Sequence, residues 1–315
     1  MINSPGKALG RTLDSDNFPK IAVIGASSMV GSRFCELFNY QKSLIKADLN
    51  GQNPVDITDS QSVSAFFNNN DFQYVILFSA FTDVDAAEKQ RNDQNASCWQ
   101  INVKGAENVI IECANNNKKL IFISTSFVFD GQKGPYAENA QRGGDLEKIS
   151  WYGITKLKAE EAIEKALKDH LIIRITYPYR ANFPAKQDFA RQILEKYRNN
   201  SLYPMFTDQI FTPTFIDDLA PAFEILIKSN SSGIFHITSP SPATPYDFAK
   251  ELLTVFGMET SKLEKGSLAE FLKDNTKTPR PINSSLLSQK IEGIGFRPTD
   301  WVSGIKAIYS QSRKN

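Results

Sequence analysis

A tyrosine and a lysine four residues apart have the types and spacing of an acid–base pair. They open the stretch SWYGITKLKAEEAIEKALKDH, in which one predicted helix face carries Tyr152, Lys156, Ala159, Ile163 and Ala166. Burying a lysine on such an apolar helix face costs free energy unless its ammonium group is paired or takes part in binding or catalysis. Beside Tyr152, its positive charge would lower the phenol pKa from about 10 and prepare the tyrosine for proton transfer near neutral pH. The alternative is that Lys156 extends its amine to water from the start of the helix.

Polar side chains interrupt two further apolar stretches. Asn102 lies on the apolar face of the predicted helix CWQINVKGAENVIIECA, from where it could help to hold Lys156 through backbone or water. The predicted strand LIFISTS delivers Ser124, Thr125 and Ser126 to its carboxyl end, where open α/β sheets bind ligands. A hydroxyl there could donate to the oxygen of a reacting carbonyl. The alternative for all four residues is structural, with the hydroxyls satisfying loop backbone.

The stretch IAVIGASSMVGSRF, residues 21–34, has the outline of a phosphate-binding turn. Gly25 suits the tight turn and Gly31 the close packing of helix on strand, while Ser28 replaces the middle glycine. A helix beginning near Met29 would direct free N–H groups and its positive dipole end at a pyrophosphate. The alternative is an ordinary strand-to-helix turn.

An acidic residue follows this turn at the distance typical of dinucleotide-binding folds. Asp48 ends the second predicted strand, about 20 residues after Gly25. Its carboxylate would accept from a ribose 2′-hydroxyl and repel a 2′-phosphate, which favours NAD over NADP. Arg33 leaves that preference open, and the carboxylate could also be merely solvated.

The elements that must position these residues follow a β-α-β rhythm. Helix-like stretches alternate with short apolar runs, several apolar on both faces, which we predict to be the strands 21–25, 43–48, 74–80, 120–126 and 171–176. The pattern indicates an α/β fold of the Rossmann type, with a doubly wound parallel sheet. We expect a polar tail over 1–19, the nucleotide-binding domain over 20–180, and a mainly substrate-binding lobe over 181–315. The chain would return to the first domain near 208–238.

Composition excludes several classes of function. The chain has 315 residues, 41% of them hydrophobic, and a formal charge of +1, which gives no electrostatic case for nucleic acid or an anionic membrane. No apolar run approaches a membrane span, and the N-terminal segment has no apolar signal region. Three scattered cysteines and two histidines argue for a reducing, cytoplasmic location and against a zinc site or a histidine-based triad.

Taken in order, these motifs resemble the extended short-chain dehydrogenase/reductase superfamily, and more narrowly the dTDP-4-dehydrorhamnose reductase group, the RmlD-like substrate-binding domain family. The resemblance runs from about residue 20 to 308. The stretches that carry it are GASSMVG, DITD (56–59), AFTDVDAAE (80–88), INV (101–103), STSFVFDG (124–131), YGITK (152–156), TPTFIDDLA (212–220), GIFHIT (233–238) and RPINSSL (280–286).

The resemblance implies roles for individual residues. Tyr152 would donate the proton, Lys156 would bind the nicotinamide ribose, Thr125 would hydrogen-bond the substrate carbonyl, and Asn102 would complete the tetrad. The cofactor would also contact the phosphate turn, the adenine-flanking pair and a third strand end: Gly25, Ser28, Met29, Val30, Gly31, Asp48, Asp56, Ile57, Ala80, Phe81 and Thr82. On the substrate side the group has an aspartate where this chain has Ser126, and usually a tryptophan where it has Tyr177. Arg280 would bind the nucleotide diphosphate.

The sequence thus predicts an NAD(P)-dependent reductase acting on a 4-keto nucleotide-linked deoxysugar. Ser28, Ser126 and Leu77 depart from the group's pattern, and Ser126 puts the sugar in question. One alternative is a non-catalytic regulatory subunit, since the chain also resembles the methionine adenosyltransferase regulatory subunit. Another is a related epimerase or dehydratase that keeps its nicotinamide tightly bound. A homodimer is left open.

Overall fold

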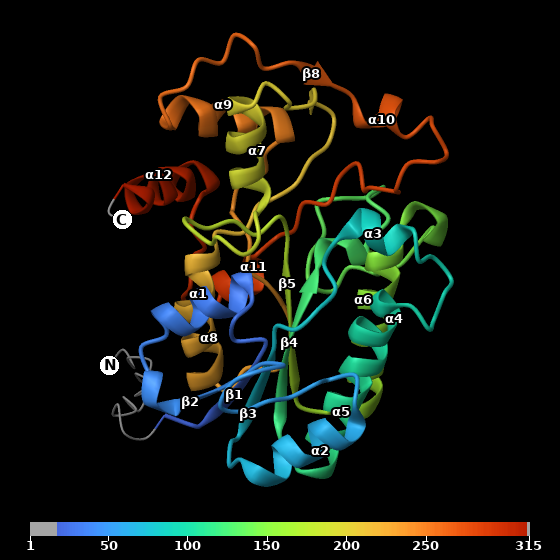
Figure 1. Cartoon of the computed structure of the whole chain (residues 1–315), viewed down its shortest axis with the longest axis vertical. Coiled ribbons are helices and arrows are strands. Elements are labelled where there is room, and N and C mark those ends of the chain that lie inside the picture. Colours follow the sequence, from blue (N-terminus) through green and yellow to red (C-terminus); the bar gives the residue numbers. More distant parts are fainter. Residues whose placement is uncertain (1–17, 314–315) are drawn as a thin grey trace, which may run out of the picture.

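The computed structural model describes residues 18–313. Its main sheet is parallel, with the strand order β2-β1-β3-β4-β5-β7 (Figure 1). The strands are β1 (Ile21–Ile24), β2 (Leu44–Ala47), β3 (Tyr74–Leu77), β4 (Lys119–Thr125), β5 (His170–Ile175) and β7 (Gly233–His236). A second, two-stranded sheet pairs β6 (Met205–Phe206) with β8 (Lys265–Gly266). The predicted doubly wound α/β fold is confirmed.

Helices cover both faces of the main sheet, and side chains alternate between them as the pleat requires. Ile21 and Val23 of β1 pack on the α1 and α8 side, whereas Ala22 and Ile24 pack on the side of α2, α5 and α6. The helices are α1 (Met29–Leu37), α2 (Ser60–Asn69), α3 (Val84–Glu88), α4 (Ser97–Trp99), the π-helical turn η2 (Gln100–Gly105), α5 (Ala106–Asn115), α6 (Trp151–Ala166), α7 (Phe189–Arg198), α8 (Leu219–Lys228), α9 (Pro245–Val255), α10 (Leu268–Phe271), α11 (Gln289–Glu292) and α12 (Trp301–Ser312).

A smaller lobe stands beyond the carboxyl ends of the strands. Figure 1 shows α7, α9 and α12 grouped there, and their apolar side chains form a separate core. Between α7 and α9 the chain returns to the large sheet, where it contributes α8 against α1 and the edge strand β7. Chain from both sides of residue 180 therefore builds the sheet half of the molecule.

Phe18, the first described residue, is part of the protein core. Residues 1–17 of the expected tail lie outside the described residues, but Phe18 is buried and stacks on Tyr40 with ring centroids 4.0 Å apart. The expectation of a loose tail is therefore wrong at this position, because an aromatic ring gains more by joining the α1 core than by remaining in water. Over residues 18–313, no helix is both long and apolar enough to cross a membrane.

Candidate functional site

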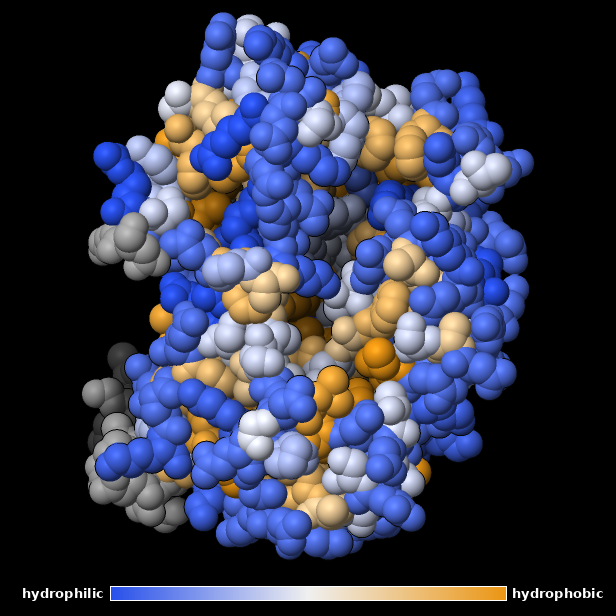
Figure 2. Space-filling view, in the orientation of Figure 1, coloured by the Kyte–Doolittle hydropathy of each residue, from blue (hydrophilic) through white to orange (hydrophobic). Residues whose placement is uncertain are grey.

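A cleft of about 1050 Å³ separates the carboxyl ends of the strands from the lobe. In Figure 2 it is the hollow near the centre of the face, with apolar residues along its edges. Most of the residues that the sequence singled out line it: Gly25, Ser28, Met29, Val30, Asp48, Asp56, Ile57, Ala80, Thr82, Ser124, Thr125, Tyr152, Lys156, Tyr177 and Arg280. Gly31, Phe81, Asn102 and Ser126 do not belong to that lining.

Both glycines of the turn are required by its geometry. Gly25 has φ +85°, and a Cβ there would lie 2.6 Å from the Ser79 nitrogen. A Cβ on Gly31 would lie 2.2 Å from the Gly25 carbonyl oxygen, so only glycine lets α1 approach β1 this closely. Ser28, in the middle position, is the N-cap of α1, and its hydroxyl accepts from the Gly31 N–H at 3.0 Å. The serine therefore stabilises the helix start that a phosphate would use.

The residues at this turn fit a dinucleotide. Met29 and Val30 occupy the first turn of α1, where N–H groups have no carbonyl of their own helix to bond, and both residues line the cleft. Together with the helix dipole, these N–H groups suit a pyrophosphate. Asp48 lies beside them and accepts from the Ser27 backbone N–H at 3.0 Å and from the Ser27 hydroxyl at 2.8 Å.

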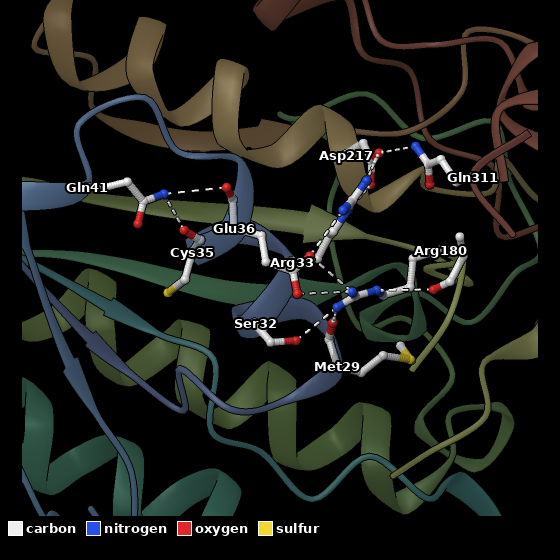
Figure 3. Close-up of polar contacts among 10 residues, drawn as sticks. Met29, Ser32, Arg33, Cys35, Glu36, Gln41, Arg180, Asp217 and Gln311 are labelled. Carbon is white, nitrogen blue, oxygen red and sulfur yellow. Dashed lines mark hydrogen bonds and ion pairs between the residues drawn. The ribbon is translucent and has the colours of Figure 1, made fainter. Parts of the chain in front are cut away.

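Arginines near this turn are committed to protein partners (Figure 3). Arg33 holds Asp217 with two hydrogen bonds of 2.7 and 2.6 Å and pairs with Glu36 at 3.0 Å. Arg180, from the segment after β5, donates to the Met29 carbonyl at 3.1 Å and also pairs with Glu36. These contacts attach α1 to the chain that follows residue 180.

Tyr152, Lys156 and Thr125 line the same cleft. Burial raises the pKa of Tyr152 to about 12, although a hydrogen bond with the Thr125 side chain opposes that shift. Burial also lowers the pKa of Lys156 to about 7, against the attraction of Glu160 one helical turn further on. Lys156 is 2% exposed, and its Nζ lies 3.8 Å from the centroid of the Phe122 ring. The expected lowering of the tyrosine pKa by the lysine is therefore not found in the protein alone, because desolvation dominates for both groups.

A buried ion pair lies below the lysine. Glu160 of α6 and Arg174 of β5 are both fully buried and form two hydrogen bonds, of 3.0 and 2.7 Å. Ser124 donates to the same carboxylate. Its hydroxyl is therefore engaged beneath the cleft, and among the three hydroxyls of this strand end Thr125 is the one placed beside Tyr152.

Asn102 supports the site although it does not line the cleft. It lies in the π-helical turn η2, a distortion that often marks functional sites. Its amide accepts from the Phe81 N–H at 2.8 Å, donates to the Phe81 carbonyl at 3.0 Å, and donates to Thr155 at 3.0 Å. Asn102 thereby ties the segment after β3 to α6. Its side-chain hydrogen bonds are with Phe81, Thr155 and, at 3.7 Å, the Cys98 sulfur.

The predicted substrate residues are placed differently from one another. Ser126 is fully buried and donates to Thr176 at 2.9 Å, so it presents no group to the cleft. Tyr177 lines the cleft, and its hydroxyl is bonded by Gln209. Arg280 also lines it and pairs with Asp85 of α3 at 2.7 Å, which connects the lobe side of the cleft to the sheet side.

Sequence reasoning missed the lobe's contribution to this cleft. Phe183, Lys186, Asp188 and Phe189 line it from the segment after β5, and Lys186 donates to Thr82 across it. The available signal was weak, since it consisted of two phenylalanines in an otherwise polar connection.

Comparisons with known proteins agree on the kind of protein. The family model described as RmlD substrate binding domain matches residues 19–314. The spore coat polysaccharide biosynthesis protein SpsK of Bacillus subtilis is 30% identical, over 94% of this chain and 98% of its own. A dTDP-4-dehydrorhamnose reductase of Mycolicibacterium smegmatis is 28% identical, over 90% and 82%. The crystal structure of a dTDP-4-dehydrorhamnose reductase of Bacillus anthracis in complex with NADP superimposes with a TM-score of 0.82 at 23% identity, covering 93% of this chain and 99% of that one.

Proposed function

Because the chain belongs to the RmlD substrate binding domain family, as its sequence led us to expect, we propose that it reduces a 4-keto nucleotide-linked deoxysugar with Tyr152 as the proton donor. The chain is an NAD(P)-dependent reductase of the short-chain type, as predicted. The observation that carries the finer proposal is that Thr125, Tyr152 and Lys156 line the same cleft as the β1–α1 turn, with the Thr125 side chain hydrogen-bonded to Tyr152.

The protonation state of Tyr152 suits a donor. With a pKa of about 12, its hydroxyl is protonated at every physiological pH. When hydride reaches the carbonyl carbon, the oxygen becomes an alkoxide, a stronger base than a phenolate, and takes the phenol proton. Thr125, beside the phenol, would donate to the same oxygen and fix the carbonyl for attack. The charged form of Lys156, one helical turn away, would stabilise the phenolate left behind.

The cofactor would lie along the cleft from the phosphate turn to Tyr152. The Met29 and Val30 N–H groups would hold its pyrophosphate, and Lys156 its nicotinamide ribose, near Ala80 and Thr82. The nicotinamide, when bound, supplies the hydride. Asn102 would act only through Phe81, by fixing the backbone that borders the cofactor.

We further propose that NADH is preferred to NADPH. The Asp48 carboxylate, fixed by Ser27, would accept from a ribose 2′-hydroxyl and repel a 2′-phosphate. Arg33, which had left the preference open, is held by Asp217 and Glu36 on the side of α1 that faces α8. A 2′-phosphate would have to break those ion pairs to gain this cation.

Arg280 would bind the substrate's diphosphate. A guanidinium suits phosphate oxygens, and the pair with Asp85 is exposed enough to exchange, since the Asp85 side chain is 62% exposed. Ser126, expected beside the sugar, would not touch it, because its hydroxyl is buried against Thr176.

The test is turnover of dTDP-4-keto-6-deoxysugars, followed as NADH oxidation. Tyr152→Phe should lower kcat by at least about a hundredfold, the usual value of a positioned proton donor, while NADH still binds. Tyr309→Phe, on α12, is the matched control and should leave kcat unchanged. Full turnover by Tyr152→Phe would refute the proposed role, and conversion of a sugar without net NADH consumption would point to the epimerase or dehydratase alternative.

A further inference from the structure

Tyr177 is held in a backbone conformation that an aromatic residue seldom adopts. Its φ is +41°, in the left-handed region, which costs energy for any residue with a bulky Cβ substituent. The ring is fixed by three phenylalanines from different segments, with centroids 4.6 Å away for Phe211, 5.1 Å for Phe189 and 6.1 Å for Phe127. Strain that is maintained in this way at a cleft wall indicates that the direction of the side chain matters.

The position of Tyr177 along the cleft points to the substrate rather than the cofactor. Phe127 separates it from Tyr152, with both ring pairs at 6.1 Å between centroids. On the other side, the charge of Arg280 is close enough to act on the Tyr177 hydroxyl. Tyr177 therefore lies between the reacting group and the cation proposed for the diphosphate, the place where a sugar would lie.

Gln209 fixes the hydrogen-bonding direction of that hydroxyl. Gln209 is 2% exposed, and its Nε2 lies 3.3 Å from the Pro281 carbonyl oxygen and 3.2 Å from Tyr177 Oη. A carbonyl oxygen can only accept, so the amide atom that faces Pro281 must be the nitrogen. The same nitrogen then donates its second hydrogen to Tyr177. The amide orientation is thus set by chemistry, because a flipped amide would place two oxygens against each other.

The consequence is a hydroxyl with one free hydrogen. Among the hydrogen bonds of residues 18–313, Tyr177 Oη has Gln209 as its one partner, and in that bond it accepts. Burial raises the pKa of Tyr177, so the phenol keeps its proton, although Arg280 and Gln209 oppose the shift. The charged neighbours Arg280 and Asp85 are paired with each other. The O–H of Tyr177 is therefore available to a ligand in the cleft.

We propose that Gln209 is a positioning residue that makes the Tyr177 hydroxyl a donor to an oxygen of the substrate's sugar. The inference rests on the proposed function for the sugar's identity as part of a nucleotide sugar. The proposed contact would contribute to substrate specificity. A sugar with an acceptor oxygen at this position would be favoured, because the Tyr177 O–H would remain unpaired if that oxygen were missing. Through Pro281, the same amide also connects the sugar position to the chain that carries Arg280.

The experiment measures the affinity that the sugar adds to the nucleotide. dTDP and dTDP-glucose are titrated by calorimetry into the full chain, and the ratio of their Kd values is compared between variants. Tyr177→Phe should lower the ratio of the dTDP Kd to the dTDP-glucose Kd about five- to tenfold, as expected for one lost hydrogen bond. The Kd of dTDP itself should not change. Gln209→Glu should do the same, because a carboxylate would draw the phenol hydrogen toward itself. Gln209→Met is a gentler variant that should lower the ratio less, and Tyr309→Phe is the matched control.

The proposal is overturned if wild type binds dTDP-glucose no more tightly than dTDP, or if Tyr177→Phe leaves the ratio unchanged. A variant that weakens both ligands equally would show a purely structural role and would overturn it as well. These outcomes are distinct from failure of the proposed reductase function, which is scored by NADH oxidation rather than by binding. If the chain binds dTDP-glucose more tightly than dTDP but does not oxidise NADH, the inference about Tyr177 stands and the proposed reduction is refuted.

Discussion

The Asp48 carboxylate, at the end of β2, accepts hydrogen bonds from both the backbone N–H and the hydroxyl of Ser27. The contact attaches the β1–α1 turn to the end of the neighbouring strand, and Asp48 lines the cleft there. One side chain thereby shapes the turn, and we propose that it also binds the ribose of the cofactor.

We predict that Asp48→Ala loses discrimination between cofactors. NADH should bind about tenfold more weakly, since a charge-assisted hydrogen bond is lost, and NADPH should bind better because a repelling charge has gone. Nicotinamide fluorescence titrations measure both Kd values. Asp71→Ala, at an exposed site before β3, is the control. An unchanged ratio of the two Kd values would contradict the assignment.

Ser28 should matter more to stability than to cofactor binding. As N-cap of α1, its replacement by alanine should cost about 1 kcal/mol of unfolding free energy, and replacement by glycine only a few tenths. NADH should bind Ser28→Gly with a Kd close to that of wild type, because the hydroxyl is turned to the Gly31 N–H. Urea denaturation and fluorescence titration check the two parts. Markedly tighter NADH binding by Ser28→Gly would mean that the side chain obstructs the pyrophosphate.

Lys156 should make the cofactor-free protein more stable at alkaline pH. Its pKa is about 7 when folded against 10.5 as the ordinary value, so between these limits the unfolded chain binds more protons and stability rises with pH. The gain from pH 7 to pH 9 should be about 2 kcal/mol. Urea denaturation at the two pH values should show this rise in wild type and its loss in Lys156→Met. An equal change in unfolding free energy between pH 7 and pH 9 in the two proteins would refute the prediction.

His236 should limit stability at acid pH. Its Nδ1 donates to the Leu287 carbonyl at 3.0 Å and its Nε2 faces Arg174 at 3.4 Å, so protonation would place two buried cations together. Burial and Arg174 lower its pKa to about 3, against 6.5 ordinarily, and stability is therefore lost as pH falls through that interval. Wild type should be about 2–3 kcal/mol less stable at pH 4.5 than at 7.5 from this group. His236→Asn keeps a donor for the Leu287 carbonyl. Urea denaturation at the two pH values should show a smaller loss of unfolding free energy between pH 7.5 and pH 4.5 in this variant than in wild type.

The parts of the fold and site that depend on local pattern could be predicted from sequence. Apolar runs between helical stretches located β1 to β5 of the main sheet, because burial on both faces leaves a continuous signature, whereas the edge strand β7 was not among the predicted strands. Tyr152 and Lys156 were recognisable because their spacing places them on one helix face, and α6 has the expected course. The turn glycines were recognisable because φ and close approach exclude other residues there.

The parts that depend on distant contacts could not be predicted. Gln209 meets Tyr177 across 32 residues of sequence and Arg280 meets Asp85 across 195, and no periodicity encodes such pairs. The pKa of Tyr152 was misjudged because sequence shows the neighbouring lysine but not the depth of burial. Ser126 was assigned to the sugar from the family resemblance alone, whereas its hydroxyl donates to Thr176, which directly follows β5.

The two regions of the molecule cannot be exchanged as modules at residue 180. Chain beyond that point supplies the edge strand β7, the helix α8 that packs on α1, and Asp217, which accepts two hydrogen bonds from Arg33 of α1. A chimaera joining residues 20–180 to the later chain of a relative would therefore replace the edge strand of the sheet and the partners of α1 with those of another protein. Recombination that aims to alter sugar choice should instead graft the cleft-facing segments 181–214 and 240–286 and retain residues 215–239 as part of the recipient's own scaffold.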